Sequence, residues 1–110
     1  MNKLIISGKN KLNGKVRLTA AKNAVLPLIA ACLLTKEEVV FYDVPELSDV
    51  AAMIELIKSL GCRAEQCGNM LAIKCESVDP KKIDNDVVRK IRSSFFLLGA
   101  LLARTGEAYI

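Results

Sequence analysis

The chain has 110 residues, which is enough for one domain with a modest core. Its composition, 52% hydrophobic and 25% charged, is that of a globular protein, and it contains neither Trp nor His. The lack of His excludes imidazole metal ligands and histidine acid–base chemistry, while the net charge of +4 favours an anionic partner.

The positive charge is concentrated in the first third of the chain. Residues 1–35 contain six basic residues and no acidic residue. This distribution suits an anionic ligand, and a solvent-exposed hairpin or an RNA-binding surface are the alternatives. No aromatic residue lies among these basic residues, since Phe41 is the first in the chain. We therefore expect no nucleic-acid partner.

The four cysteines lack the paired C-x-x-C spacing of zinc sites and predict no metal; they are Cys32, Cys62, Cys67 and Cys75. The apolar run Leu4-Ile5-Ile6 is too short for a signal peptide, and the run from Phe95 to Ala103 is too short to span a bilayer. These features predict a cytoplasmic protein with free thiols and no membrane contact.

The predicted elements follow from apolar periodicity and from turn residues such as Asn13-Gly14. In chain order they are strands at 3–7 and 15–19, a helix at 23–34, a strand at 38–44, a helix at 49–60 capped by Ser48, strands at 63–66 and 70–74, and a helix at 85–104. The closing Glu-Ala-Tyr-Ile is interpreted as the start of a further strand, and hence the chain as truncated. This order predicts an α/β (α+β) fold in which helices cover one face of a sheet.

The start of the first helix is the strongest candidate for a binding site. Lys22 and Asn23 precede an apolar run, and Pro27 is tolerable only near a helix start. A helix N-terminus offers N–H groups and positive potential, and a lysine adds a full charge. Asn23 is a candidate N-cap as well as a ligand contact. We expect a phosphate or carboxylate to bind here.

Two further patterns concern the middle and the end of the chain. A two-residue turn at Gly68-Asn69 would place Cys62 directly opposite Cys75, close enough for a disulfide, although two thiols are expected in a reducing cytosol. The second half of the helix at 85–104 is apolar on every face, which predicts neighbours on all sides.

Several motifs together resemble the N-terminal quarter of the UDP-N-acetylglucosamine 1-carboxyvinyltransferases, which are enolpyruvyl transferases of the EPSP synthase family. The matching segments are Lys22-Asn23-Ala24 with Leu26-Pro27, Asp43-Val44-Pro45, Leu47-Ser48-Asp49-Val50, Leu60-Gly61, Arg92-Ser93-Ser94 and Leu98 to Arg104. The related enolpyruvylshikimate-phosphate synthases have a Lys-Ser type motif at the first of these positions, so Asn23 favours the UDP-sugar enzymes.

The resemblance implies an inside-out α/β barrel of two domains built from β-α-β-α-β-β units. Residues 1–21 would be a strand hairpin of the second domain, and residues 22–110 an incomplete first domain. The implied reaction moves the enolpyruvyl group of phosphoenolpyruvate to the 3-hydroxyl of UDP-N-acetylglucosamine and releases phosphate. It needs no cofactor and is the first committed step of bacterial peptidoglycan synthesis. A basic RNA-binding module without enzymatic activity is the alternative.

The resemblance also implies roles for individual residues. Lys22 and Asn23 match the phosphoenolpyruvate-binding pair, Arg92 matches the arginine that binds UDP-N-acetylglucosamine, and Asp49 matches an acid close to the lysine. Phe96 stands where many members have Trp. The proton-donating Cys of the family matches none of the four cysteines here, and we expect the chain alone to be inactive without the remaining part of the protein.

Overall fold

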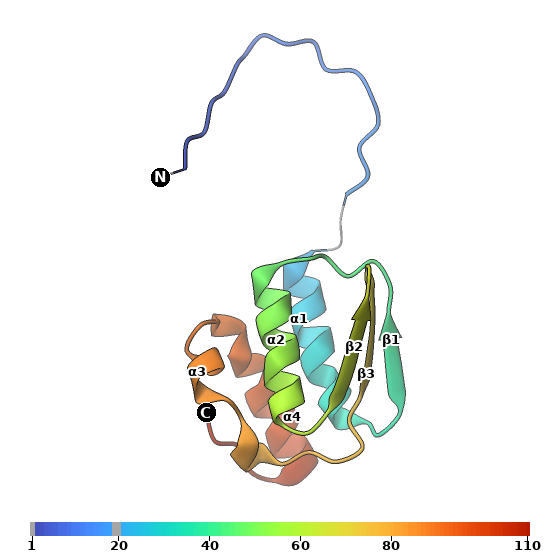
Figure 1. Ribbon diagram of the computed structural model, residues 1–110, viewed down its shortest axis with the longest axis vertical. Coiled ribbons are helices and arrows are strands. Elements are labelled where there is room, and N and C mark those ends of the chain that lie inside the picture. Colours follow the sequence, from blue (N-terminus) through green and yellow to red (C-terminus); the bar gives the residue numbers. More distant parts are fainter. Residues whose placement is uncertain (1, 19–20) are drawn as a thin grey trace.

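The computed structural model describes residues 2–18 and 21–110 (Figure 1). Within this part, one three-stranded sheet lies against a group of helices, which confirms the α+β class. The helices and strands are α1 Lys22–Ala31, β1 Glu38–Phe41, α2 Ser48–Ser59, β2 Arg63–Cys67, β3 Met70–Lys74, α3 Asn85–Val88 and α4 Phe95–Thr105. Short 3-10 turns are η1 Cys32–Leu34, η2 Pro80–Lys82 and η3 Arg92–Ser94.

The sheet is antiparallel, with β3 in the centre between β1 and β2. Cys67 pairs with Met70, so Gly68 and Asn69 form the predicted two-residue turn. Ala64, Leu71 and Ile73 are buried on one face of the sheet. They share this face because successive side chains of a strand point to opposite sides. The helices cover this face (Figure 1).

Helix α2 packs against the sheet and against α1, and α1 in turn contacts α4. The predicted apolar stripe of α2 is buried, and the side chain of Leu56 is fully buried beside it; the stripe comprises Val50, Met53, Ile54, Ile57 and Leu60. Each fully buried side chain of this size stabilises the fold by roughly 1.5–3 kcal/mol. The N-terminal end of α2 is thereby held against α1.

Gly61 ends α2, as predicted. It has φ +104°, its N–H donates to Lys58 O at 3.1 Å, and the N–H of Cys62 donates to Ile57 O at 3.2 Å. These bonds form a Schellman motif, which favours glycine at the left-handed position. The motif carries the chain directly into Cys62 at the start of the hairpin.

The expectation of two thiols at Cys62 and Cys75 is wrong for this structure. The two residues lie opposite each other as predicted, with Cα atoms 4.4 Å apart, and form a disulfide. The expectation rested on the redox compartment, whereas the hairpin register places the two sulfur atoms within bonding reach. Cys32 and Cys67 are free thiols, the former buried and the latter exposed.

The predicted strand at 38–44 ends early, at Phe41. Asp43 has φ +58°, which turns the chain out of the extended conformation. Asn69 Nδ2 donates to Asp43 Oδ1 at 3.1 Å, and the N–H of Val44 donates to Asn69 O at 2.8 Å. These two bonds fix the segment before α2 to the hairpin turn.

The predicted strands at 3–7 and 15–19 are wrong over their described residues. Residues 2–18 form an extended segment without regular secondary structure, which runs away from the helices and the sheet (Figure 1); residue 19 lies outside the described residues. The apolar side chains of this segment are 81–92% exposed; they are Leu4, Ile5, Ile6, Leu12, Val16 and Leu18. A two-stranded hairpin is marginal without a partner for its apolar face, and the segment has none here.

The predicted helix at 85–104 is broken in the middle. Asp84 caps α3 by accepting from the N–H of Asp86 at 3.0 Å, but the chain becomes extended at Ile91 and resumes as η3 and α4. Ser94 Oγ donates to Ile91 O at 3.0 Å, a local bond that competes with the helical ladder. Because of the break, Arg92 and Ser93 belong to η3 and do not continue the axis of α3.

Helix α4 buries only one side in this chain. Leu97 and Leu101 are fully buried, whereas Phe95 is 70% exposed and Leu102 is 49% exposed. Residues 107–110 have no regular secondary structure, so the expected strand there is not formed. In the described residues, no helix has both the length and the apolar character needed to cross a membrane.

Candidate functional site

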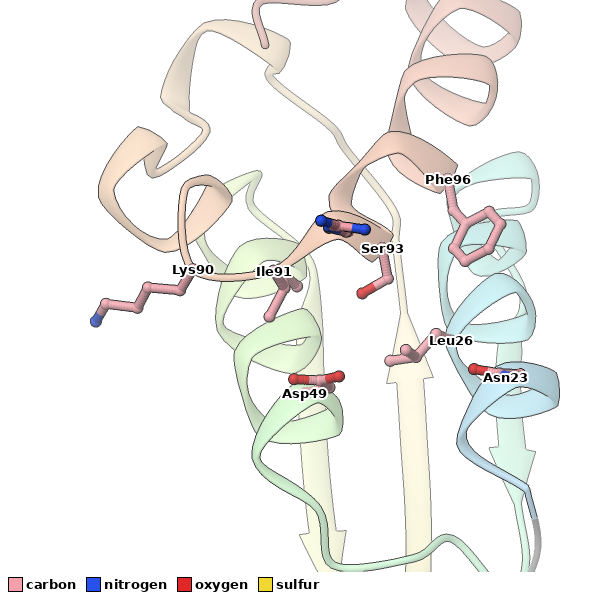
Figure 2. Close-up of a pocket in the computed structure, with 8 residues that line it drawn as sticks. Asn23, Leu26, Asp49, Lys90, Ile91, Ser93 and Phe96 are labelled. Atoms are coloured by element: carbon pink, nitrogen blue, oxygen red, sulfur yellow. The ribbon is translucent and has the colours of Figure 1, made fainter.

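A pocket of about 470 Å³ lies between the first turns of α1 and α2 and the segment that leads into α4 (Figure 2). This volume is within the range of small-molecule sites. The pocket is lined by Asn23, Leu26, Asp49, Lys90, Ile91, Arg92, Ser93 and Phe96. Four of the five predicted site residues therefore meet here, although they come from three separate parts of the sequence.

The α1 side of the pocket contains Asn23. The prediction that Asn23 caps the helix is wrong, because Ala21 is the N-cap residue and α1 has no side-chain cap bond. The reason is that α1 begins at Lys22, so Asn23 lies inside the first turn, beyond the capping position. Its amide, exposed at the pocket, can both donate and accept hydrogen bonds. The side chain of Lys22, the other predicted member of the pair, lies outside the described part of the chain.

The α2 side contains Asp49, whose half-buried carboxylate lies across the pocket from Asn23 (Figure 2). The predicted Ser48 cap is wrong, because Ser48 is the first helical residue and Leu47, which has no capping oxygen, is the N-cap. Asp49 therefore supplies the acidic group in the first turn, where it is favoured by the helix dipole.

The third side is formed by Arg92, Ser93 and Phe96, which follow the break in the helix. Arg92 is exposed at the pocket. Phe96 is 47% exposed, and its ring lies beside α1 (Figure 2). A continuous helix would have extended the axis of α3 through these positions. The sequence prediction of one long helix missed this geometry, although the Ser93-Ser94 pair was a signal for it.

Leu26, Lys90, Ile91 and Ser93 line the pocket without having been predicted to do so. Leu26 and Ile91 are buried and form its apolar lining. The side chain of Lys90 extends outward, and its ammonium group points away from the other labelled lining residues (Figure 2). Lys90 could have been suggested by its position two residues before Arg92, whereas the role of Leu26 requires knowledge of the packing.

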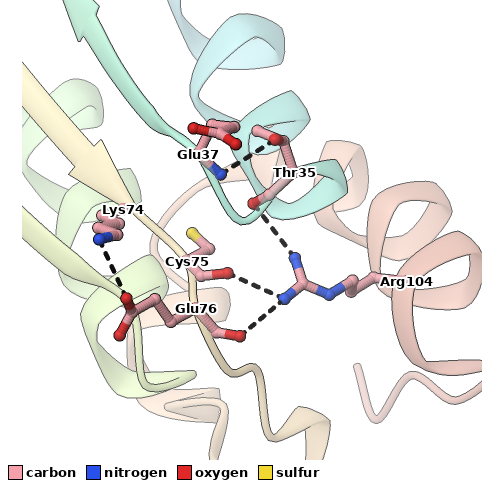
Figure 3. A network of polar contacts seen from close by, with 6 residues as sticks. All are labelled: Thr35, Glu37, Lys74, Cys75, Glu76 and Arg104. Atoms are coloured by element: carbon pink, nitrogen blue, oxygen red, sulfur yellow. Dashed lines mark hydrogen bonds and ion pairs between the residues drawn. The ribbon is translucent and has the colours of Figure 1, made fainter.

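Arg104 lies near the C-terminal end of α4, and its hydrogen bonds hold this end of the helix in place (Figure 3). The orientation of α4 relative to the pocket, which contacts its N-terminal end, depends on these bonds. One guanidinium nitrogen donates to Leu33 O at 2.7 Å and to Thr35 O at 3.2 Å. The other donates to Cys75 O at 2.9 Å and to Glu76 O at 3.1 Å. Hydrogen bonds from a charged donor are among the stronger ones in proteins. Arg104 thus ties α4 to the ends of η1 and β3.

The pocket combines groups that suit a negatively charged, hydroxyl-bearing ligand. Arg92 supplies positive charge, Asn23 supplies a donor and an acceptor, and Phe96 offers an apolar surface. Asp49 is an acceptor for a hydroxyl or a positive group. Across the described residues, no cluster of three or more His, Cys, Asp or Glu side chains could hold a metal ion.

Known proteins match this chain over almost its whole length. The family model of EPSP synthase (3-phosphoshikimate 1-carboxyvinyltransferase) matches residues 6–110. A UDP-N-acetylglucosamine 1-carboxyvinyltransferase of Thermotoga petrophila is 41% identical over 110 residues, which are 100% of this chain and 26% of that protein. One of Methylacidiphilum infernorum is 43% identical over the same shares.

A solved structure agrees with the sequence relatives. The crystal structure of the enolpyruvyl transferase NikO from Streptomyces tendae superposes with a TM-score of 0.79 at 27% identity, over 92% of this chain and 24% of that one. The chain spans about a quarter of the length of these relatives. The family match, the identities and the fold lead to one conclusion: this chain belongs to the EPSP synthase family of carboxyvinyltransferases.

Proposed function

We propose that the chain is the N-terminal part of a UDP-N-acetylglucosamine 1-carboxyvinyltransferase. The whole enzyme would transfer the enolpyruvyl group of phosphoenolpyruvate to the 3-hydroxyl of UDP-N-acetylglucosamine and release phosphate. The observation that carries the proposal is the pocket, which gathers Asn23, Asp49, Arg92 and Phe96. The relatives that bear this name, all bacterial, support the choice of substrate.

The reaction would proceed by addition and elimination. The sugar hydroxyl loses its proton and its oxygen bonds to C2 of phosphoenolpyruvate, while C3 gains a proton. The resulting tetrahedral ketal then loses phosphate from C2 and a proton from C3, which restores the double bond. Charge builds up on phosphate and carboxylate oxygens, so fixed positive groups stabilise the intermediate.

The residues of this chain would contribute binding and electrostatics. Lys22 and Asn23 would bind phosphoenolpyruvate, and the Asn23 amide suits the attacking hydroxyl or the departing bridging oxygen. Arg92 would bind UDP-N-acetylglucosamine, and Phe96 would pack against this substrate. Asp49 would accept a hydrogen bond from a substrate hydroxyl or pair with a cation nearby. The proton donor for C3 would come from another part of the whole enzyme.

The rest of the proposal concerns the surroundings of the chain. Residues 1–21 would form a strand hairpin in the second domain and residues 22–110 would belong to the first, which agrees with the exposed apolar side chains of segment 2–18. The exposed face of α4 supports a neighbouring part of the same protein as its partner. We place the enzyme in the bacterial cytoplasm, where it would begin peptidoglycan synthesis.

Phosphate release by the full-length protein tests the proposal. With both substrates present, we expect turnover, and Arg92→Ala should raise the KM for UDP-N-acetylglucosamine by about tenfold to a hundredfold, since a charge-assisted bond contributes about 1.5–3 kcal/mol. Arg89→Ala is the matched control, because Arg89 is an exposed arginine that pairs with Asp86 at 3.7 Å, and it should leave KM unchanged.

A full-length protein that releases no phosphate but binds RNA would overturn the assignment in favour of the RNA-binding alternative. No observation in the described part of the chain favours that alternative. The basic residues of segment 2–18 lie without aromatic neighbours in sequence, and the pocket places a carboxylate beside its cations.

A further inference from the structure

Ser93 contains the one buried side-chain oxygen in the described residues that lacks a hydrogen-bond partner. Leaving such a group unpaired costs about 1–3 kcal/mol, and folded proteins contain few of them. The same residue lines the pocket, and its hydroxyl points toward the space between Asp49 and Leu26 (Figure 2). No described protein group pairs with this hydroxyl, so a ligand in the pocket is a candidate for its partner.

The neighbour Ser94 shows that the local backbone does not force this state. Ser94 Oγ is buried, and its single O–H donates to Ile91 O at 3.0 Å, with Val88 O as a longer shared acceptor at 3.5 Å. Two adjacent serines of one 3-10 turn therefore have opposite hydrogen-bonding states. Ser94 stabilises the break in the helix, whereas the hydroxyl of Ser93 has no such structural use.

We propose that Ser93 is a substrate-binding residue whose hydroxyl donates a hydrogen bond to a phosphate oxygen of the bound substrate. The proposal rests on the proposed function and adds a residue to that site. Oγ itself is buried at the pocket wall, and a change of χ1 to another staggered position is the step by which it would reach a ligand in the pocket. Arg92 adjoins Ser93 and lines the same pocket, so a guanidinium is available to pair with the phosphate, whereas Asp49 limits how deep the phosphate sits.

The phosphate oxygen has two sources, the diphosphate of UDP-N-acetylglucosamine and the phosphate of phosphoenolpyruvate. Calorimetric titration of the full-length protein separates them, with UDP, phosphoenolpyruvate and inorganic phosphate as probes. We expect Ser93→Ala to weaken binding of one of the two substrate probes about three- to tenfold, the range for one hydrogen bond. The weakened probe identifies the phosphate that Ser93 contacts.

Thermal unfolding of the ligand-free protein distinguishes binding from a structural role. Ser93→Ala removes an unpaired buried hydroxyl, so its Tm should equal or exceed that of the wild type. Ser94→Ala, the matched control, removes the hydrogen bond that this hydroxyl donates and should lower Tm. A lower Tm for Ser93→Ala with unchanged affinities would overturn the proposal and assign the serine to the fold.

Affinities for all three probes within twofold of the wild type would also overturn it, whatever the Tm. The failure of the proposed function is recognised separately, because it would appear as the absence of phosphate release by the wild type. In that event the titration with inorganic phosphate still decides the role of Ser93: a loss of affinity in Ser93→Ala supports it, and no loss refutes it.

Discussion

At the level of single residues, the two free thiols, Cys32 and Cys67, lie in different surroundings. Cys32 is 3% exposed on the inner side of η1, and its burial raises the pKa of the thiol from its ordinary value of 9.0 to about 11. Burial disfavours the thiolate, which is the reactive form. Cys67 lies exposed in the hairpin at the end of β2.

This contrast predicts a strict order of alkylation by iodoacetamide at pH 8. Cys67 should react quickly, Cys32 only after unfolding, and Cys62 and Cys75 only after reduction of their disulfide. Mass spectrometry of the modified chain measures the order. A Cys67→Ser variant is the control and should remain unmodified in the native state. Rapid labelling of Cys32 at pH 8 would contradict the burial.

The raised pKa also gives a direction for alkaline stability. Between pH 9 and about 11 the unfolded thiol of Cys32 ionises while the folded one stays protonated, so the unfolded state binds fewer protons. Stability contributed by this thiol is therefore complete below pH 9 and is lost as the pH rises through that window. Urea unfolding at pH 8 and pH 10.5 should show a larger decrease for the wild type than for Cys32→Ala.

At the level of elements, Arg104 connects parts of the chain that are about seventy residues apart in sequence. Its carbonyl partners lie at the end of η1 and beyond the end of β3. In the sequence, Arg104 was only one member of a family motif. The four backbone carbonyls to which it donates could not be inferred, because they come together only in the folded chain.

Replacing Arg104 by Ala should lower the free energy of unfolding by about 3 kcal/mol, since four bonds from a charged donor are lost. Arg104→Lys should lose less, because a single ammonium reaches fewer of these carbonyls. Arg89→Ala, on the exposed surface, should change it by at most about 0.5 kcal/mol. Urea unfolding of the chain measures all three, and equal stability of Arg104→Ala and wild type would refute the role.

Elements with local signals were predictable, and the others were not. The hairpin of β2 and β3 and the burial pattern of α2 follow from Gly68-Asn69 and from helical periodicity. The break at Ile91 was missed because it is accompanied by a side-chain bond from Ser94, which an otherwise helical pattern does not reveal. In the site, Lys22 and Asn23 were selected by the helix start and by the resemblance, and Asp49, Arg92 and Phe96 by the resemblance. The pocket gathers all but Lys22, whose side chain lies outside the described residues.

At the level of the whole molecule, segment 2–18 contributes little to the fold of the rest. Its recorded ion pair, Arg17 with Asp43 at 3.6 Å, joins side chains that are 87% and 59% exposed. Such pairs contribute about 0–1 kcal/mol. The hairpin predicted here needs an apolar partner surface, which the proposed second domain would provide.

Deletion of residues 2–18 should therefore leave the free energy of unfolding of this chain within about 0.5 kcal/mol of the wild type, as measured by urea. In the full-length protein, the same deletion should lower the Tm, because the segment would lose its place in the second domain. The control is Arg17→Ala, which should change neither the free energy of unfolding of this chain nor the Tm of the full-length protein. A large loss of stability in the short chain would show that the segment packs on residues 21–110.

The uncovered side of α4 has a practical consequence for work with the chain in isolation. Phe95, Phe96 and Leu102 are exposed to water, and Phe96 lines a shallow hollow together with the exposed Leu34 of η1. A net charge of only +4 offers weak mutual repulsion between molecules. Stock solutions of the chain will therefore cloud as they are concentrated, and adding salt will hasten this by screening the charge. The exposed apolar side of α4 is therefore the reason to store the chain at low protein concentration and low ionic strength.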